Sequence, residues 1–397
     1  MSIRHHRTAA LAALLLAAST QLIACGEPAD PQSVLIAATA TANEPAPSLS
    51  PEAEQALQDA IESDDGAAYL ITVRDGQPVA VDGQVDLRLL RDGTQEIEND
   101  ESLRQLKTTA LLDLLRGRVQ AVDPDQGDLD LLTLLVGAGR HPGSATVIAI
   151  SSGVQTRAPL DERVLGFDFD SGTVVDDLAN RHLLPDLAGK TVIFIGLGDV
   201  AGAQPALTTS ARSAVVNLWL TICRRAGAVS CAVDPTPVAP TPPVATTPVP
   251  VVSVPDPSTL SLDPIPAGDG TTQQQQQQSL PSELLFEPNQ AALLPQAQDA
   301  LAPLAARIIA DRSEVHLVGH AWKVAENDDP GRADELSTLR AQAVRDLLVT
   351  LQVAQSQIVE VRGAGFAEPI TPTDTTDPQA VAAANRVVQV TLVETAG

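Results

Sequence analysis

Two pairs of closely spaced acidic residues are the first features of this sequence that could support chemistry. Asp128 and Asp130 form one pair, and Asp168 and Asp170 form the other. Residues two apart share one face of a strand, so either pair could serve in general acid and base catalysis. The chain, however, carries 50 acidic against 25 basic residues, a net charge of −25. In such a chain, solvated acids are the default interpretation.

Other catalytic signatures are missing from the sequence. It has no Gly-x-Ser-x-Gly or His-Glu-x-x-His motif, and no Cys/His cluster with metal-ligand spacing. Gly196, Gly198 and Gly202 follow an expected strand, but Pro205 separates them from the next helix, which favours a structural turn over a dinucleotide loop. We therefore expect no enzymatic activity, no metal and no cofactor.

The composition argues against a nucleic-acid partner. A net charge of −25 repels phosphate backbones, and 5 Phe, 2 Trp and 1 Tyr leave few rings for stacking on bases. Apolar residues make up 44% of the chain, which is enough for folded cores. A length of 397 residues predicts more than one folded unit.

Residues 1–24 have the organisation of a secretion signal. Arg4 and Arg7 precede a small, apolar run at 8–18 that is too short for a permanent membrane span. This segment and the tetrapeptide Leu-Ile-Ala-Cys at 22–25 resemble a bacterial lipoprotein signal peptide with its lipobox. The resemblance implies cleavage before Cys25 and a lipid, palmitate included, on that cysteine. It also implies attachment to the extracytoplasmic face of the cell membrane, or of an outer membrane.

Two cysteines remain, Cys223 and Cys231. In an exported chain a disulfide between them is favoured, and two free thiols are the alternative.

Residues 51–233 are predicted to form an α/β domain. Buried-type strands alternating with helices indicate a mainly parallel sheet with helices on both faces. The strands are expected at 68–73, 145–150 and 191–195, and the helices at 101–118, 128–139, 174–184 and 210–226. Residues 25–50 are expected to be a flexible tether, and the proline- and glutamine-rich residues 234–279 an extended linker.

Residues 280–397 are predicted to form a second, two-layer domain of order β-α-β-α-β. Its strands are expected at 284–286, 315–318, 358–361 and 387–393, and its helices at 295–311 and 332–351.

Five short stretches of the second domain occur in a characteristic order. They are Leu-Phe at 285–286 with Asn289, VHLVGH at 315–320, LSTLRAQAV at 336–344, RGAG at 362–365 with Pro369, and NRVV at 385–388. Together they resemble the OmpA-like C-terminal domain family, the peptidoglycan-binding module of many envelope lipoproteins. The resemblance implies candidate peptidoglycan-binding residues at Arg340, Trp322, His320, Asn385 and Arg386.

In that family an arginine holds the carboxylate of a diaminopimelate residue, and an aspartate faces its ammonium. Arg340 matches the arginine, whose fork of donors fits a carboxylate. Trp322 stands where the aspartate is expected, so its ring face, or an acid at 326, 328 or 329, would take the ammonium. The alternatives are a structural salt bridge for Arg340 and a packing role for Trp322.

The end of the strand at 145–150, Ser151-Ser152-Gly153, and the segment 192–199 resemble von Willebrand A-like domains. Metal-binding members of that family carry Asp-x-Ser-x-Ser after the first strand. Residues 75–79, which match that position, lack both serines, so the resemblance implies no metal site.

These features predict a cell-envelope lipoprotein that tethers a membrane to peptidoglycan non-covalently. Its partners are peptidoglycan, the membrane through Cys25, and an envelope protein on the N-terminal domain. One alternative is an envelope scaffold whose degenerate OmpA-like domain binds a protein instead of the wall. Another is a wall-remodelling enzyme.

Overall fold

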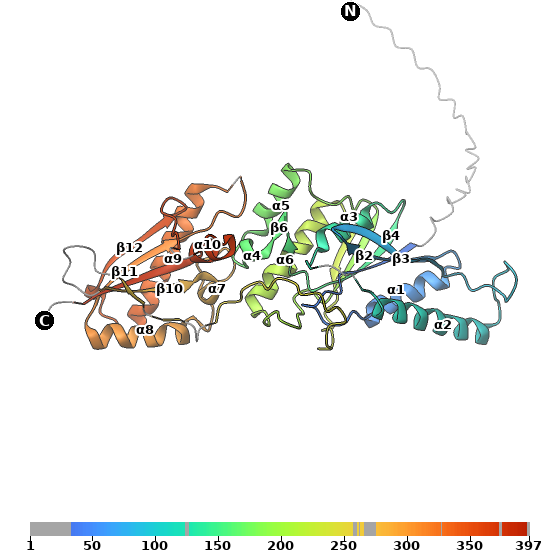
Figure 1. Ribbon diagram of the computed structural model, residues 1–397, viewed down its shortest axis with the longest axis horizontal. Helices are drawn as coiled ribbons and strands as arrows, with labels where there is room; N and C mark the ends of the chain where they lie inside the picture. Colours follow the sequence, from blue (N-terminus) through green and yellow to red (C-terminus); the bar gives the residue numbers. More distant parts are fainter. Residues whose placement is uncertain are drawn as a thin grey trace, which may run out of the picture. The chain divides into compact units, whose positions relative to one another are not determined.

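The computed structural model describes residues 33–123, 127–256, 260–261, 263–265, 275–326, 328–372 and 375–394. The expected signal peptide at 1–24 and the expected lipidation site at Cys25 lie outside these residues. Within the described part of the chain, no helix is long and apolar enough to cross a membrane. The elements build two large, separate sheets (Figure 1), which we assign to an N-terminal and a C-terminal domain, and a small two-stranded sheet.

The sheet of the N-terminal domain is mostly parallel, as predicted. Its order is β3-β2-β1-β4-β7-β8, and β3 pairs antiparallel with β2 at one edge. The central strands are continuous apolar runs because helices cover both faces. The strands are β1 (Ser33–Ala38), β2 (Ala67–Arg74), β3 (Gln77–Asp86), β4 (Ala145–Ile150), β7 (Lys190–Ile195) and β8 (Ser230–Val233).

Alternate residues of these strands enter two hydrophobic cores, one on each face. Helices α1 (Pro51–Glu62) and α2 (Glu101–Gln120) contribute to one core. The other core is built from α3 (Leu131–Gly139), α5 (Ser171–Asn180) and α6 (Thr209–Arg225). The connection between α3 and α5 also contains the short strands β5 (Thr156–Arg157) and β6 (Leu160–Asp161) and the one-turn helix α4 (Glu162–Leu165).

The expected tether at 25–50 is wrong from residue 33 onward. Residues 33–38 form β1, which lies between β2 and β4 in parallel register, with Val34 opposite Ala68 and Thr146. The strand has an apolar centre, Val34-Leu35-Ile36, which the composition of residues 25–50 taken as a whole did not reveal. Its conformation comes from pairing on both edges.

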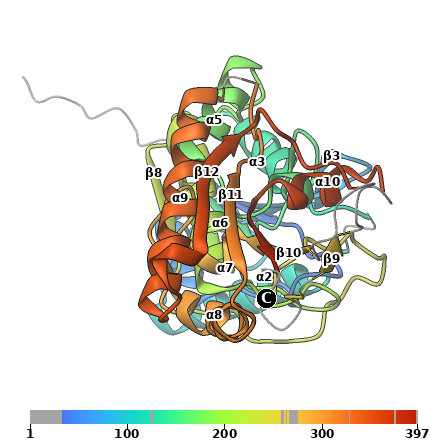
Figure 2. The ribbon, with the colours of Figure 1, turned by 90° about the vertical axis from the view of Figure 1, so that its left-hand side faces the viewer.

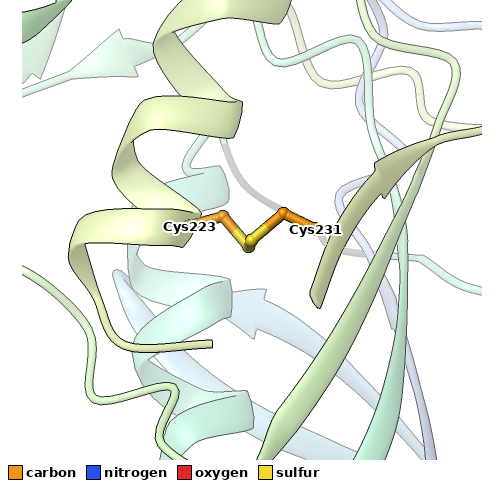
Figure 3. Close-up of a disulfide and its surroundings, with 2 residues drawn as sticks. All are labelled: Cys223 and Cys231. Carbon is orange, nitrogen blue, oxygen red and sulfur yellow. A yellow bond between two sulfur atoms is a disulfide. The ribbon is translucent and has the colours of Figure 1, made fainter. Parts of the chain in front are cut away.

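A disulfide joins α6 to the edge strand β8 (Figure 3). Cys223 is fully buried in the last turns of α6, and its Cα lies 6.2 Å from that of Cys231.

The C-terminal domain has a sheet of order β12-β11-β13-β10-β9, packed on helices that include α8 and α9 (Figure 2). Strand β13 pairs antiparallel with both β10 and β11, and β11 pairs parallel with β12. The expected strand at 284–286 is wrong, because residues 282–285 form a helical turn. The elements are β9 (Asp263–Ile265), β10 (Gln275–Pro281), α7 (Ser282–Leu285), α8 (Ala297–Asp311), β11 (Glu314–His320), α9 (Pro330–Thr350), β12 (Ile358–Gly365), α10 (Pro378–Ala384) and β13 (Val387–Val393).

The expected linker at 234–279 is wrong in two stretches. The last glutamines of the run form β10, whose backbone pairs with β13, Gln276 lying opposite Leu392. Farther upstream, Val249 and Val252 are buried in the N-terminal core, and the Gln204 side chain bonds both the N–H and the C=O of Val252. Prolines remove donors from this segment, but backbone groups of Val238, Val249, Pro250 and Val252 still bond side chains of the N-terminal domain.

Candidate functional site

Arg340 lies in the middle of α9 with its side chain only 2% exposed. Its Nε donates to the carbonyl of Gln290 at 2.9 Å, and its guanidinium carbon lies 5.1 Å from the centre of the Phe286 ring. These contacts hold the guanidinium against the loop between α7 and α8, with both terminal nitrogens turned away from α9's own domain core. The helix therefore holds the guanidinium in a fixed position, with both terminal nitrogens free of α9 and able to donate to one carboxylate.

A carboxylate from the N-terminal domain accepts hydrogen bonds from both of these nitrogens. Arg340 Nη1 and Nη2 donate to Oδ2 and Oδ1 of Asp168 at 2.5 and 2.7 Å. The backbone N–H of Asn289 donates to the same Asp168 at 2.8 Å, and its side-chain amide donates to Asp170 at 3.1 Å. Asp168 lies between α4 and α5, and its side chain is 7% exposed. This contact links the two domains through a buried, bidentate ion pair.

The charge state of Asp168 follows from two opposing effects. Burial by itself raises the pKa of the carboxyl, because the charged form loses water. The Arg340 guanidinium and the Asn289 N–H outweigh burial, so the pKa of Asp168 lies below its ordinary value. Asp168 is thus a carboxylate at neutral pH.

A second buried ion pair lies beside the first. Arg386 donates to Glu283 at 3.2 Å and, across the domain boundary, to the carbonyl of Val164 at 2.7 Å. Glu283 in turn accepts from the N–H of Phe167 at 3.1 Å. Burial is the main effect on Glu283 and raises its pKa.

The backbone next to the Arg386–Glu283 pair requires a glycine, Gly166. Gly166 has a φ of +66°, and a Cβ there would lie 2.5 Å from Arg386 and Glu283 atoms.

A cavity of about 280 Å³ opens next to Arg340 and Asp168. Its lining is rich in acids, and Trp322 contributes an aromatic surface. Further lining residues are Asp170, Asp176, Asp328, Asp329 and Arg332. The space beside the ion pair is thus polar, and negatively charged groups predominate in it.

Three of the five predicted site residues, Arg340, Trp322 and Arg386, line this cavity. His320 ends β11, where its Nδ1 lies 3.1 Å from the carbonyl of Glu368, and burial lowers its pKa. Asn385 bonds the N–H and C=O of Ile370, so it fixes a loop of its own domain. The structure thus brings together the two arginines and the tryptophan, with the other two side chains turned to backbone groups.

Asp168 is the residue that sequence reasoning misjudged. It was expected to be a solvated acid, yet it is buried and paired. The available signal was its sequence, Gly-Phe-Asp-Phe-Asp at 166–170, in a chain with 5 phenylalanines. Phe167 and Phe169 are 2% and 4% exposed, so an acid between them is drawn into an interior.

The other acid pair is structural. Asp130 caps α3 by accepting from Thr133, and it also accepts from the Gln155 side chain. Arg157 lies 3.4 and 3.5 Å from Asp128 and Asp130.

At the carboxyl end of β1 and β4 a hydroxyl cluster surrounds Glu44. Its carboxylate accepts from Thr39, Thr41, Ser151 and the Ser152 N–H. Residues 75–79, matched above to a metal motif, instead form the tight turn after β2 and the first residues of β3. The described residues contain no group of three or more His, Cys, Asp or Glu side chains placed to hold a metal.

Residues 285–383 match the model of the OmpA family, and the C-terminal domain is therefore OmpA-like. No curated protein matches the chain.

Among solved structures, the chain is similar to the periplasmic domain of Helicobacter pylori MotB, at 19% identity over 34% of this chain and 88% of that one, with a TM-score of 0.25. It is also similar to the cell wall anchor of the T6SS from Pseudomonas aeruginosa, at 20% identity over 35% and 90%, with a TM-score of 0.27. The peptidoglycan-associated lipoprotein from Burkholderia pseudomallei is 23% identical over 28% and 88%, with a TM-score of 0.22.

Proposed function

We propose that this protein is a cell-envelope anchor whose OmpA-like domain binds the peptide stem of peptidoglycan. The observation that carries the proposal is the bidentate hold of Arg340 on a carboxylate, at 2.5 and 2.7 Å. A guanidinium fork recognises any carboxylate of that geometry. In the proposed complex, a stem-peptide carboxylate, such as that of diaminopimelate, takes the place of Asp168. The match of residues 285–383 to the OmpA family supports this ligand.

The cavity beside Arg340 supports a ligand that also carries an ammonium. We assign the ammonium to the Trp322 ring face and the carboxylates of Asp328 and Asp329, which line the same cavity. Arg386 belongs to the cavity wall in this proposal.

We assign supporting roles to the other two predicted site residues. His320 and Asn385 position loops through their backbone contacts.

The membrane side of the proposal depends on Cys25. We propose that a lipid on this cysteine attaches the chain to the extracytoplasmic face of a membrane, so that the protein tethers membrane to wall without catalysis. The N-terminal domain, which we propose to be von Willebrand A-like, then remains available to an envelope protein. Incorporation of labelled palmitate into the wild type and its loss in Cys25→Ser is the test of this part.

Wall binding is tested by pelleting the full-length protein in detergent with purified sacculi over a concentration series. We expect Arg340→Ala to lower the bound fraction at least tenfold, because the stem carboxylate loses its partner. Arg345→Ala is the matched control, since Arg345 lies on the same helix and pairs with the exposed Asp346. Equal pelleting of Arg340→Ala and wild type contradicts the pocket assignment.

One observation favours a second candidate. Both pocket arginines, Arg340 and Arg386, already contact groups of the N-terminal domain. An OmpA-like domain that serves only as a scaffold for this domain would show the same contacts. Absence of pelleting at every concentration, for the wild type and for variants that free Arg340, would favour the scaffold.

A further inference from the structure

The segment that reaches Arg340 alternates between two environments. Phe167 and Phe169 are buried in the N-terminal core, whereas Asp168 between them pairs with Arg340. The two buried phenylalanines therefore anchor the backbone on both sides of the carboxylate that they flank. Asp168 is held in place by its own domain and projects into the other.

Contacts on both sides of Asp168 position this segment. Arg386 and Glu283 bind the backbone at Val164 and Phe167, and Asn289 binds Asp168 and Asp170. The segment is thus bound along its backbone and through its charge, as a peptide ligand is bound.

The loop after β11 turns toward the same partner. Val324 packs against the N-terminal core, and the N–H of Glu326 donates to Asp177 at 3.3 Å. This is the loop in which Trp322 replaces the aspartate expected of the family. Its departure from the family pattern coincides with its contact to the N-terminal domain.

The interface has the properties of a reversible contact. Its buried ion pairs lose water on closing, and this cost offsets much of their attraction. The cavity of about 280 Å³ leaves the surroundings of Arg340 and Asp168 incompletely packed. It also offers an external ligand a route to the guanidinium.

We propose that residues 166–170 are an internal ligand of the OmpA-like pocket, and that Asp168 competes with an external carboxylate for Arg340. The chain then has a closed state, in which its own carboxylate occupies the pocket, and an open state that binds the wall. The inference rests on the proposed function, because competition requires that an external carboxylate bind at Arg340.

The size of the effect follows from the populations of the two states. The apparent dissociation constant is the intrinsic one divided by the open fraction, so a closed population of about 90–99% weakens binding about 10- to 100-fold. Such populations are reached easily because a competitor in the same chain acts at a high effective concentration.

The test compares full-length variants for binding of a soluble muropeptide that carries diaminopimelate, followed by calorimetry. We expect Asp168→Ala to bind about 10- to 100-fold more tightly than the wild type, because the pocket opens. Asp346→Ala is the matched control: it removes an exposed acid that pairs with Arg345 and does not line the cavity, and we expect wild-type affinity. We expect weak muropeptide binding both by Arg340→Ala and by the double variant Asp168→Ala/Arg340→Ala.

A second variant is designed to open the interface without changing Arg340 or Asp168. Gly166→Ala places a Cβ 2.5 Å from Arg386 and Glu283, so it should also bind more tightly. Hydrogen exchange at the Glu326 amide, which donates to Asp177 of the N-terminal domain, should accelerate in both variants if the interface opens.

The outcomes separate the two proposals. If Asp168→Ala and Gly166→Ala bind like the wild type while Arg340→Ala does not bind, the internal ligand is refuted and wall binding stands. If accelerated exchange shows that the pocket is open and still no variant binds muropeptide, both proposals fail. Should one variant fail to fold, the other decides.

Discussion

The buried pair of Arg340 and Asp168 allows a quantitative prediction about stability. Removal of one partner leaves the other charge without compensation, which costs about 3–5 kcal/mol for a buried pair. Asp168→Ala also removes the acceptor of the Asn289 N–H, which adds about 1 kcal/mol. If the interface stays closed, we therefore expect a loss of about 4–6 kcal/mol in the free energy of unfolding.

The two domains can limit this loss by separating. Once they part, Arg340 regains water, and the loss cannot exceed the free energy of docking. In either case the double variant Asp168→Ala/Arg340→Ala should have a free energy of unfolding only slightly lower than that of each single variant. We expect a coupling of about 1–3 kcal/mol if the domains part, which is the free energy of docking for a closed population of about 90–99%, and a larger one if they stay together, since both single changes disrupt the same contact.

Urea unfolding, followed by circular dichroism and tryptophan fluorescence, measures this coupling at pH 7. Trp219 lies in the N-terminal core and Trp322 in the C-terminal domain, so fluorescence reports on both. The control cycle uses the exposed pair Arg345 and Asp346 on the same helix, for which we expect below about 0.5 kcal/mol. A coupling that small for Arg340 and Asp168 would refute the reasoning.

The sign of the pH dependence is also determined. The pKa of Asp168 is lower in the folded protein than the unfolded value of about 3.9, so its contribution is fully present above that value. The contribution is lost as the pH falls through the lower, folded pKa. We therefore expect the coupling free energy at pH 5 to equal that at pH 7.

Two further predictions concern the N-terminal domain. Burial raises the pKa of Glu162 well above its usual range, and neither carboxyl oxygen has a hydrogen-bond partner among the described residues. The free energy of unfolding should therefore fall as the pH rises above about 4.3, the pKa of the unfolded chain, because the folded protein must then release a proton that it binds more tightly. Glu162→Met should abolish this fall and gain about 1–3 kcal/mol at pH 7, as measured by urea unfolding; a loss of stability would contradict the assignment of a buried, unpaired carboxyl. Replacing Cys223 and Cys231 by serine should cost about 2–3 kcal/mol in thermal unfolding under non-reducing conditions, and an unchanged midpoint would argue against the disulfide.

Three features were predictable from the sequence because their signals are local. The runs at 145–150 and 191–195 are apolar on every residue that must be buried, and they became β4 and β7. The periodic segments at 101–118 and 332–351 became α2 and α9. The landmarks of the OmpA-like domain placed Arg340 on a helix, where the structure has it.

Strands β1 and β10 were missed because their conformation depends on their neighbours. Ser33–Ala38 has an apolar centre, Val34-Leu35-Ile36, but it stands in a segment that was assigned to a tether as a whole. Gln275–Pro281 begins with four glutamines, which have no strong preference for strand. Each completes a ladder with strands more than thirty residues away, and for β10 this pairing leaves no signal in a local window.

The sequence by itself determined the two sheets in outline, the helix that carries Arg340, and the arginine's capacity to bind a carboxylate. It could not determine which carboxylate Arg340 holds. Asp168 lies 172 residues away and looked like one of many solvated acids. Only the tertiary structure brought the two together, because an ion pair depends on distance in space and on the loss of water around both charges.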